Sequence, residues 1–443
     1  MREFPWRRRV LETSLVAAPL AYGTVHPLPV LLFQLAGFAL LGASLAAARQ
    51  RPGGWDRLRD PLLLTGVAAV AWGLLQLVPL PWFALKAVAP GTAHLLVADP
   101  AAHIPVPAWH GAGVVPWFTE RSVVWIAAMT AWYGVALLEV RRRADVAAVV
   151  RALALAGIVV AVLGIAQKLT GATRIFWIGI ERRDFFATFV NPNNAAGLLT
   201  LATCACVAAA FRHRRTSPVW LFGGLLTASA AALTLSRGGI GILVFALVLL
   251  MAGLRKSDAP ARRGLALVTI GAVAFVLWVG ATEVVGELAT LEKDSGTLNG
   301  RTDIWRTTLR MVPDFWLFGV GYGNFESVFP AYFDVPARVR VTAVENEYLH
   351  ALVEGGIVGA ALAGFALIAL VRRIRETFRR RGSPTLALAA GIAALLVHMC
   401  IDFPLHVGAP ALWLGVAAAL IRPRDKAASQ AVLHGPTPVS TSA

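Results

Sequence analysis

Residues 296–359, GTLNGRTDIWRTTLRMVPDFWLFGVGYGNFESVFPAYFDVPARVRVTAVENEYLHALVEGGIVG, form the longest polar interval in a chain that otherwise alternates long apolar runs with short basic hinges. The interval holds several groups suited to binding and catalysis: Arg301, Arg306, Arg310, Arg338, Arg340, Glu345, Asn346 and His350. An apolar chain keeps so many polar groups together only where they meet water or a polar ligand. This stretch is therefore predicted to be the active-site loop of a membrane enzyme.

The composition places the whole chain in a membrane. Of its 443 residues, 57% are hydrophobic and only 15% are charged, which excludes an ordinary soluble protein. The net charge of +16 could indicate a nucleic-acid partner, but the basic residues stand where apolar runs end, as orientation signals in a bilayer do. We predict an all-α, polytopic integral membrane protein that binds membrane lipids and no nucleic acid.

Twelve apolar segments are long enough to be candidate spans, since about twenty apolar residues cross a bilayer. They cover approximately residues 10–25, 28–48, 61–80, 121–140, 145–167, 193–211, 218–236, 238–254, 264–282, 347–371, 384–402 and 405–421. The basic amino terminus is expected to be an uncleaved first span. Residues 1–426 should form one transmembrane domain, with a disordered cytoplasmic tail at 427–443.

Every second hinge between the candidate spans is rich in Arg and Lys. The positive-inside rule then places both termini in the cytoplasm. All six asparagines, the 283–346 loop between the ninth and tenth spans, and a corner at 402–406 fall on the outer side. The inner hinges contain no phosphate-binding G-x-x-x-x-G-K-[ST] loop, so ATP-dependent chemistry is not expected. The three cysteines lie in apolar segments and indicate neither disulfides nor a zinc site.

Two arginines are the leading candidates for holding an anionic substrate. Arg237, in ALTLSRGGIGIL, stands between apolar runs, where a guanidinium group usually faces a partner or a wet cavity, and its planar fork of donors suits phosphate oxygens. The alternative is an arginine that reaches the lipid headgroups. Arg301 begins a predicted amphipathic helix whose apolar face carries Ile304, Trp305, Thr308 and Met311. For Arg306 and Arg310 we favour contact with anionic lipid.

Further polar groups are predicted to complete the binding site. In FFATFVNPNNAAGLL, capping a helix explains one asparagine, and the surplus makes Asn191 and Asn194 candidates for substrate binding. Arg338 and Arg340 in the polar loop are candidates for the same role, and Asp402 in CIDFPLH could pair with an arginine or face water. The glycine-rich run GVGYGNF at 319–325 is predicted to be a tight turn, because it does not open a nucleotide-binding βαβ unit.

The segment VENEYLHALVEGGIVG at 344–359 leads into the tenth span and carries the candidate bases. On a helix, Asn346 and His350 would share a face, as would His350 and Glu354. Glu345, Glu347 or His350 could accept a proton from an attacking hydroxyl. The alternatives are a helix cap for Glu345 and a packed side chain for His350.

The order of these motifs resembles the O-antigen ligase and O-antigen polymerase superfamily of bacterial envelope glycosyltransferases. The motifs are NPNN, LSRGG, GR-x-x-x-W, G-x-G-x-F, N-x-Y-L leading into E-G-G-I-x-G, and DFPLH, all between residues 185 and 410. The resemblance implies a GT-C-like helical fold. It also implies a metal-independent, inverting transfer of an oligo- or polysaccharide from undecaprenyl diphosphate to a glycan, lipid or protein acceptor, at the periplasmic face of the bacterial inner membrane and without a cofactor.

The resemblance also implies roles for particular residues. Its two arginines correspond to Arg237 and Arg301, which would hold the diphosphate, and Asn346 is the asparagine of the N-x-Y-L motif. The ligases place a catalytic histidine directly before that asparagine, where this chain has Glu345. A carboxylate can serve as the base, and His350 is the alternative. A transporter or flippase of anionic lipids would also need buried arginines, but it predicts polar residues on the inner face, which are missing here. A scaffold protein would not need a loop so dense in Arg, Asn and Glu.

Overall fold

The computed structural model describes residues 6–51, 53–97, 107–179, 181–182, 184–212, 217–254, 259–289, 295–333, 340–380 and 385–422. Each of the twelve predicted spans overlaps one helix. These helices are α1 (Trp6–Leu20), α2 (Pro27–Arg49), α3 (Pro61–Leu77), α6 (Pro116–Glu139), α7 (Arg143–Leu169), α8 (Pro192–Arg212), α9 (Ser217–Leu233), α10 (Arg237–Gly253), α11 (Ala259–Ala289), α14 (Glu347–Arg379), α15 (Leu386–His398) and α16 (Gly408–Leu420).

Most of the remaining elements lie in the segments between the candidate spans that were predicted to face outward. They are α4 (Trp82–Val88), α5 (Pro90–Leu95), α12 (Ser295–Met311), α13 (Phe325–Val328), and the two-residue strands β1 (Leu80–Pro81) and β2 (Trp109–His110), together with 3-10 turns such as η7 (Pro404–His406). The two strands pair antiparallel and are a small exception to the all-α prediction.

Within the described residues, five helices are long and apolar enough to cross a membrane: α2, α6, α7, α8 and α14. Five shorter apolar helices accompany them: α3, α9, α10, α15 and α16. The prediction of an all-α membrane protein is confirmed at this level, and the count of twelve spans stays a prediction.

Helix α8 is the centre of the bundle. Its residues from Asn194 to Ala210 are all buried, and it packs against α7, α9, α10 and α15. Small side chains allow this close approach, since a Cβ on Gly157 would lie 2.2 Å from that of Ala202, and one on Gly239 would lie 2.3 Å from that of Ala196. Such contacts are typical of helix packing in membranes.

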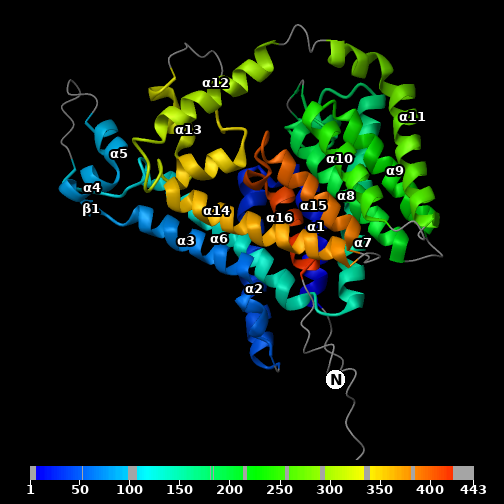
Figure 1. The fold of residues 1–443 in the computed structure, drawn as a ribbon, viewed down its shortest axis with the longest axis horizontal. Coiled ribbons are helices and arrows are strands. Elements are labelled where there is room, and N and C mark those ends of the chain that lie inside the picture. Colours follow the sequence, from blue (N-terminus) through cyan, green and yellow to red (C-terminus); the bar gives the residue numbers. More distant parts are fainter. Residues whose placement is uncertain are drawn as a thin grey trace, which may run out of the picture.

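A second, smaller core holds the polar loop on the bundle. It joins Met311 of α12, Phe325 and Val328 of α13, and Val353 of α14. Figure 1 shows α12 and α13 lying together at the upper side of the helical bundle, above the start of α14. The loop is therefore a packed layer over one end of the bundle.

Helix α14 is interrupted at Gly356, where φ is 64° and ψ is −161°. The carbonyl groups released by this break accept hydrogen bonds from outside the helix: Val353 O from the backbone N–H of Val320 (2.8 Å), Glu354 O from Gln76 Nε2 (3.0 Å) and Gly355 O from Trp72 Nε1 (2.9 Å). A broken helix survives in an apolar environment only when such groups are paired again. The break fixes the polar loop and α3 against the first turns of α14.

Candidate active site

Helix α12 is the amphipathic helix that the sequence predicted to carry Arg301. Thr308 and Met311 are buried, and Trp305 Nε1 donates a hydrogen bond of 3.0 Å to Val344 O. Arg306 lies on the exposed side and pairs with Asp303 at 3.0 Å. The amphipathic character of this helix is confirmed, but the prediction that it begins at Arg301 is wrong, because α12 begins at Ser295.

Arg301 forms an ion pair with Glu345, and the side chains of the two residues are 23% and 34% exposed. Glu345 has a φ of 54°, uncommon for a residue other than glycine. Next to it, Asn346 caps α14, accepting hydrogen bonds of 3.0 Å from the N–H groups of Tyr348 and Leu349. The predicted shared face of Asn346 and His350 does not form, because Asn346 is extended (φ −160°, ψ 109°) and precedes the helix.

The corner between α15 and α16 lies directly against the start of α14. The N–H of Glu347 donates to Met399 O at 2.9 Å, and the N–H of Leu405 donates to the Glu347 carboxylate at 2.6 Å. Asp402 lies in this corner, 1% exposed, with its carboxylate 3.6 Å from His398 Nδ1. Burial raises the pKa of Asp402 to about 7, and the Arg301 guanidinium only partly offsets this effect.

The start of α10, which carries Arg237, lies against the same corner. Ser236 caps α10 by accepting the Gly239 N–H at 2.9 Å, so the helix begins at Arg237. A Cβ on Gly238 would lie 3.6 Å from His398 Nε2 and 2.6 Å from Ile401 Cδ1. The backbone next to Arg237 therefore lies at the corner at 398–402, and Arg301, 64 positions further along the chain, acts electrostatically on Asp402 in the same corner.

The amino end of α8 adds the predicted asparagines. Asn191 Oδ1 accepts the Asn193 N–H at 2.9 Å and shapes the turn before the helix. Asn194 is buried in the first turn, and a Cβ on Gly197, one turn later, would lie 3.3 Å from His398 Nδ1. The atoms Asn194 Oδ1, His398 Nδ1 and Asp402 Oδ2 are buried and make no hydrogen bond within the described chain. Buried polar groups are normally paired, so the corner suits a polar ligand.

Arg340, which was predicted to bind substrate, does not join this constellation. Arg340 pairs with Glu326, and its side chain is 82% exposed. Arg338 lies outside the described residues.

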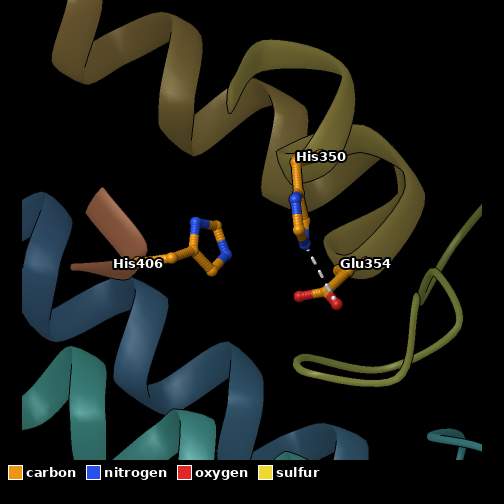
Figure 2. Close-up of side chains that lie close together, drawn as sticks. All are labelled: His350, Glu354 and His406. Carbon is orange, nitrogen blue, oxygen red and sulfur yellow. Dashed lines mark ion pairs between the residues drawn. The ribbon is translucent and has the colours of Figure 1, made fainter. Parts of the chain in front are cut away.

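A second polar cluster lies one turn further along α14 (Figure 2). His350 Nε2 is 3.2 Å from the Glu354 carboxylate, which confirms the predicted shared face of these two residues. The same carboxylate accepts the N–H groups of Gly323 (2.8 Å) and Phe325 (3.1 Å). Gly319, Gly321 and Gly323 all have positive φ angles, so the glycine-rich run is the predicted tight turn, and it delivers these N–H groups to Glu354.

His406 completes the cluster from η7. Its ring centroid lies 4.3 Å from that of His350, and its Nδ1 is 3.4 Å from the Glu347 carboxylate. Removal from bulk water by the surrounding chain lowers the pKa of His406, but the carboxylates of Glu347 and Glu354 outweigh this and raise it to about 9. Sequence reasoning gave His406 no chemical role, although its position in DFPLH, beside Asp402, was a usable signal.

A cavity of about 430 Å³ opens beside this cluster. Its polar end is lined by Glu347, His350, Glu354 and His406, and its remaining wall is mostly apolar and follows α14 as far as Leu370. Helices α3, α6, α15 and α16 supply the other sides. The site thus joins a polar region at one end of the bundle to an apolar groove along a membrane helix.

Residues 222–364 match the family model described as O-antigen ligase. The predicted resemblance is confirmed. The O-antigen ligase match includes Arg237, Arg301, Glu345, His350 and Glu354, whereas Asn194, Asp402 and His406 lie outside it. No curated protein matches the chain. Together with its apolar helices, the match supports a bacterial membrane protein that carries a region similar to the O-antigen ligases.

Proposed function

We propose that this protein is a glycosyltransferase that moves an oligo- or polysaccharide from undecaprenyl diphosphate to an acceptor hydroxyl at the periplasmic face of the inner membrane. The observation that carries the proposal is that the helix start at Arg237 lies against the buried polar corner on which Arg301, from another helix, acts electrostatically. The corner also offers Asn194 Oδ1 and Asp402 Oδ2, two buried atoms that make no hydrogen bond within the described chain.

The two guanidinium groups would hold the diphosphate of the donor. Negative charge grows on the diphosphate as the bond to the sugar breaks, and donors fixed beforehand stabilise that charge without reorganising. Arginine is well suited to this task because its planar fork matches phosphate oxygens. The departure of the diphosphate then needs no metal ion.

Glu345 is the preferred base. In the structure its carboxylate is the partner of Arg301. When a diphosphate binds Arg301, it competes with Glu345 for the guanidinium and leaves the carboxylate available to accept a proton from the acceptor hydroxyl. His350 is the alternative base, but it is 4% exposed and its Nε2 faces Glu354. Attack from the side opposite the diphosphate inverts the anomeric centre.

The apolar part of the cavity fits a lipid-linked substrate. Along α14, its wall runs from Tyr348 past Gly359 to Leu370, or roughly 30 Å at 1.5 Å per helical residue, which is about the thickness of a bilayer core. A polyprenyl chain or the lipid of an acceptor would lie in this groove with its polar end at the cluster of Glu347 and His406.

The experiment is a transfer assay with purified protein, a labelled undecaprenyl-diphosphate oligosaccharide and candidate acceptors. We expect Arg237→Ala and Arg301→Ala to lower the transfer rate about 100-fold to 1,000-fold, as the loss of a transition-state donor does. Arg306→Ala is the matched control, since Arg306 lies on the same helix but is exposed and paired with Asp303. Wild-type turnover by Arg237→Ala would end the assignment, and movement of the donor across the bilayer without product would indicate a flippase.

The same assay separates the two candidate bases. Glu345→Gln keeps the size of the side chain but removes its charge, and we expect it to abolish turnover while donor binding remains. If His350→Ala abolishes turnover and Glu345→Gln does not, the proton goes to His350 instead.

A further inference from the structure

The cluster of His350, Glu354 and His406 has the composition and geometry of a metal site. One ligand atom from each residue can be chosen so that all three lie within 4.8 Å of one another. Figure 2 shows the three side chains converging, two from α14 and one from the corner after α15. His350 and Glu354 are buried, whereas His406 is exposed. We propose that these residues bind a divalent transition-metal ion of the zinc class.

The ligand set and the spacing suit such an ion. Two imidazoles and one carboxylate, with a fourth position left open, are an established zinc ligand set. Tetrahedral zinc with bonds of 2.1 Å holds its ligand atoms about 3.4 Å apart. His350 Nε2 and Glu354 Oε1 are already 3.2 Å apart. Only the exposed His406, on a short turn, has to move closer, by up to about 1.4 Å, from within 4.8 Å to about 3.4 Å.

The surrounding carboxylates favour a divalent cation. Glu347 and Glu354 are both buried, and each accepts hydrogen bonds from backbone N–H groups that carry no full charge. A divalent ion bound by the two imidazoles would balance the charge of both carboxylates.

Glu347 would hold the ring nitrogen of His406 that faces away from the ion, as a carboxylate usually does for a histidine ligand. Its Oε1 lies 3.4 Å from His406 Nδ1, so it would receive the Nδ1 proton and turn Nε2 toward the ion. Carboxylate–histidine–metal arrangements of this kind fix the ring and strengthen binding. The open fourth position faces the cavity beside the cluster. The ion would tie the 402–406 corner to α14.

This inference does not depend on the proposed transfer reaction. The sequence predicted no metal for that reaction, and the guanidinium pair retains the diphosphate, so the ion adds a site separate from the leaving group. The test is therefore metal binding rather than turnover.

The experiment titrates Co²⁺ into the untagged, full-length protein in detergent after chelator treatment. We expect about one equivalent to bind with the visible absorption of four-coordinate Co²⁺, Zn²⁺ to displace it, and Zn²⁺ to raise the thermal unfolding temperature. His406→Ala should weaken binding about tenfold or more and lose the thermal shift. His94→Ala, which removes an exposed histidine on α5, should change neither. The proposal is overturned if the parent shows no saturable uptake, or if His406→Ala binds as tightly as the parent.

Discussion

At the scale of single residues, Asp402 is the group whose chemistry depends most on its surroundings. It is 1% exposed and faces His398, with Glu347, Glu345 and Arg301 acting on it electrostatically. Burial holds its pKa at about 7, above the ordinary value of 3.8. The folded state therefore keeps the proton between about pH 4 and pH 7, and its stability falls as the pH rises through that window.

Asp402→Asn should remove this dependence. We expect the variant to be more stable than the parent at pH 8 and to lose most of that advantage at pH 5, because there the folded parent keeps its proton and the last part of its fall in stability, between about pH 5 and pH 7, is avoided. Thermal unfolding in detergent at the two pH values measures the effect. Asp303→Asn, at an exposed carboxylate on α12, is the control. If the difference in unfolding temperature between Asp402→Asn and the parent is the same at pH 5 and pH 8, the raised pKa of Asp402 is contradicted.

The sequence predicted the contact between two residues that are one helical turn apart. It did not predict the side-chain contacts between residues that are far apart in the chain. His350 and Glu354 are four apart, so helical periodicity was enough to pair them. The pairing of Arg301 with Glu345 spans 44 positions, and the contact of His406 with Glu347 spans 59. No periodicity connects such positions, and only the fold brings them together.

At the scale of elements, α14 was predicted as one uninterrupted span, and the structure breaks it at Gly356. The pair Gly355 and Gly356 is visible in the sequence, but the sequence does not show the residues of other elements that contact this point of the helix. A Cβ on Gly356 would lie 2.0 Å from Leu317 O, and Trp72 and Gln76 of α3 bind the released carbonyls. Hydropathy finds where a helix runs and not where a neighbouring loop interrupts it.

Gly356→Ala should destabilise the protein and disturb the site. The positive φ angle alone costs about 1–3 kcal/mol for a residue with a side chain, and the collision with Leu317 adds to it. Unfolding by heat or denaturant measures the loss. Gly364→Ala is a matched control on the same helix, where an added Cβ meets nothing within 4 Å, and it should be neutral or slightly stabilising. Equal stability of the two variants would show that the break is not required.

At the scale of the whole molecule, each of the twelve apolar segments found by hydropathy coincides with a helix in the described residues, because a segment in lipid must pair its backbone groups internally. The sequence also predicted that the polar chemistry gathers at one end, since charge alternates between hinges. The structure agrees in bringing the starts of α8, α10 and α14 together around the corner after α15. The sequence did not predict that α12 and α13 pack together as a layer over the bundle. The core of this layer uses aromatic residues from a loop that lacks the periodicity of a membrane span.

The orientation of this end in the membrane can be tested with a native residue. Cys400 lies in the site corner and is exposed, whereas Cys204 and Cys206 are buried in α8. Burial raises the pKa of the Cys400 thiol, so labelling should be done at mildly alkaline pH. A membrane-impermeant maleimide should label Cys400 in intact spheroplasts, and Cys400→Ser should remove the signal.

Arg380→Cys in the Cys400→Ser background reports on the opposite end of α14, where Arg380 is exposed. Its thiol should react only after the membrane is permeabilised, because the basic hinge that follows α14 is predicted to be cytoplasmic. The reverse pattern, with Arg380→Cys labelled in intact cells and Cys400 protected, would place the guanidinium pair on the cytoplasmic side. A donor presented at the periplasmic face could not reach it there, so transfer would have to occur before the lipid-linked glycan crosses the membrane.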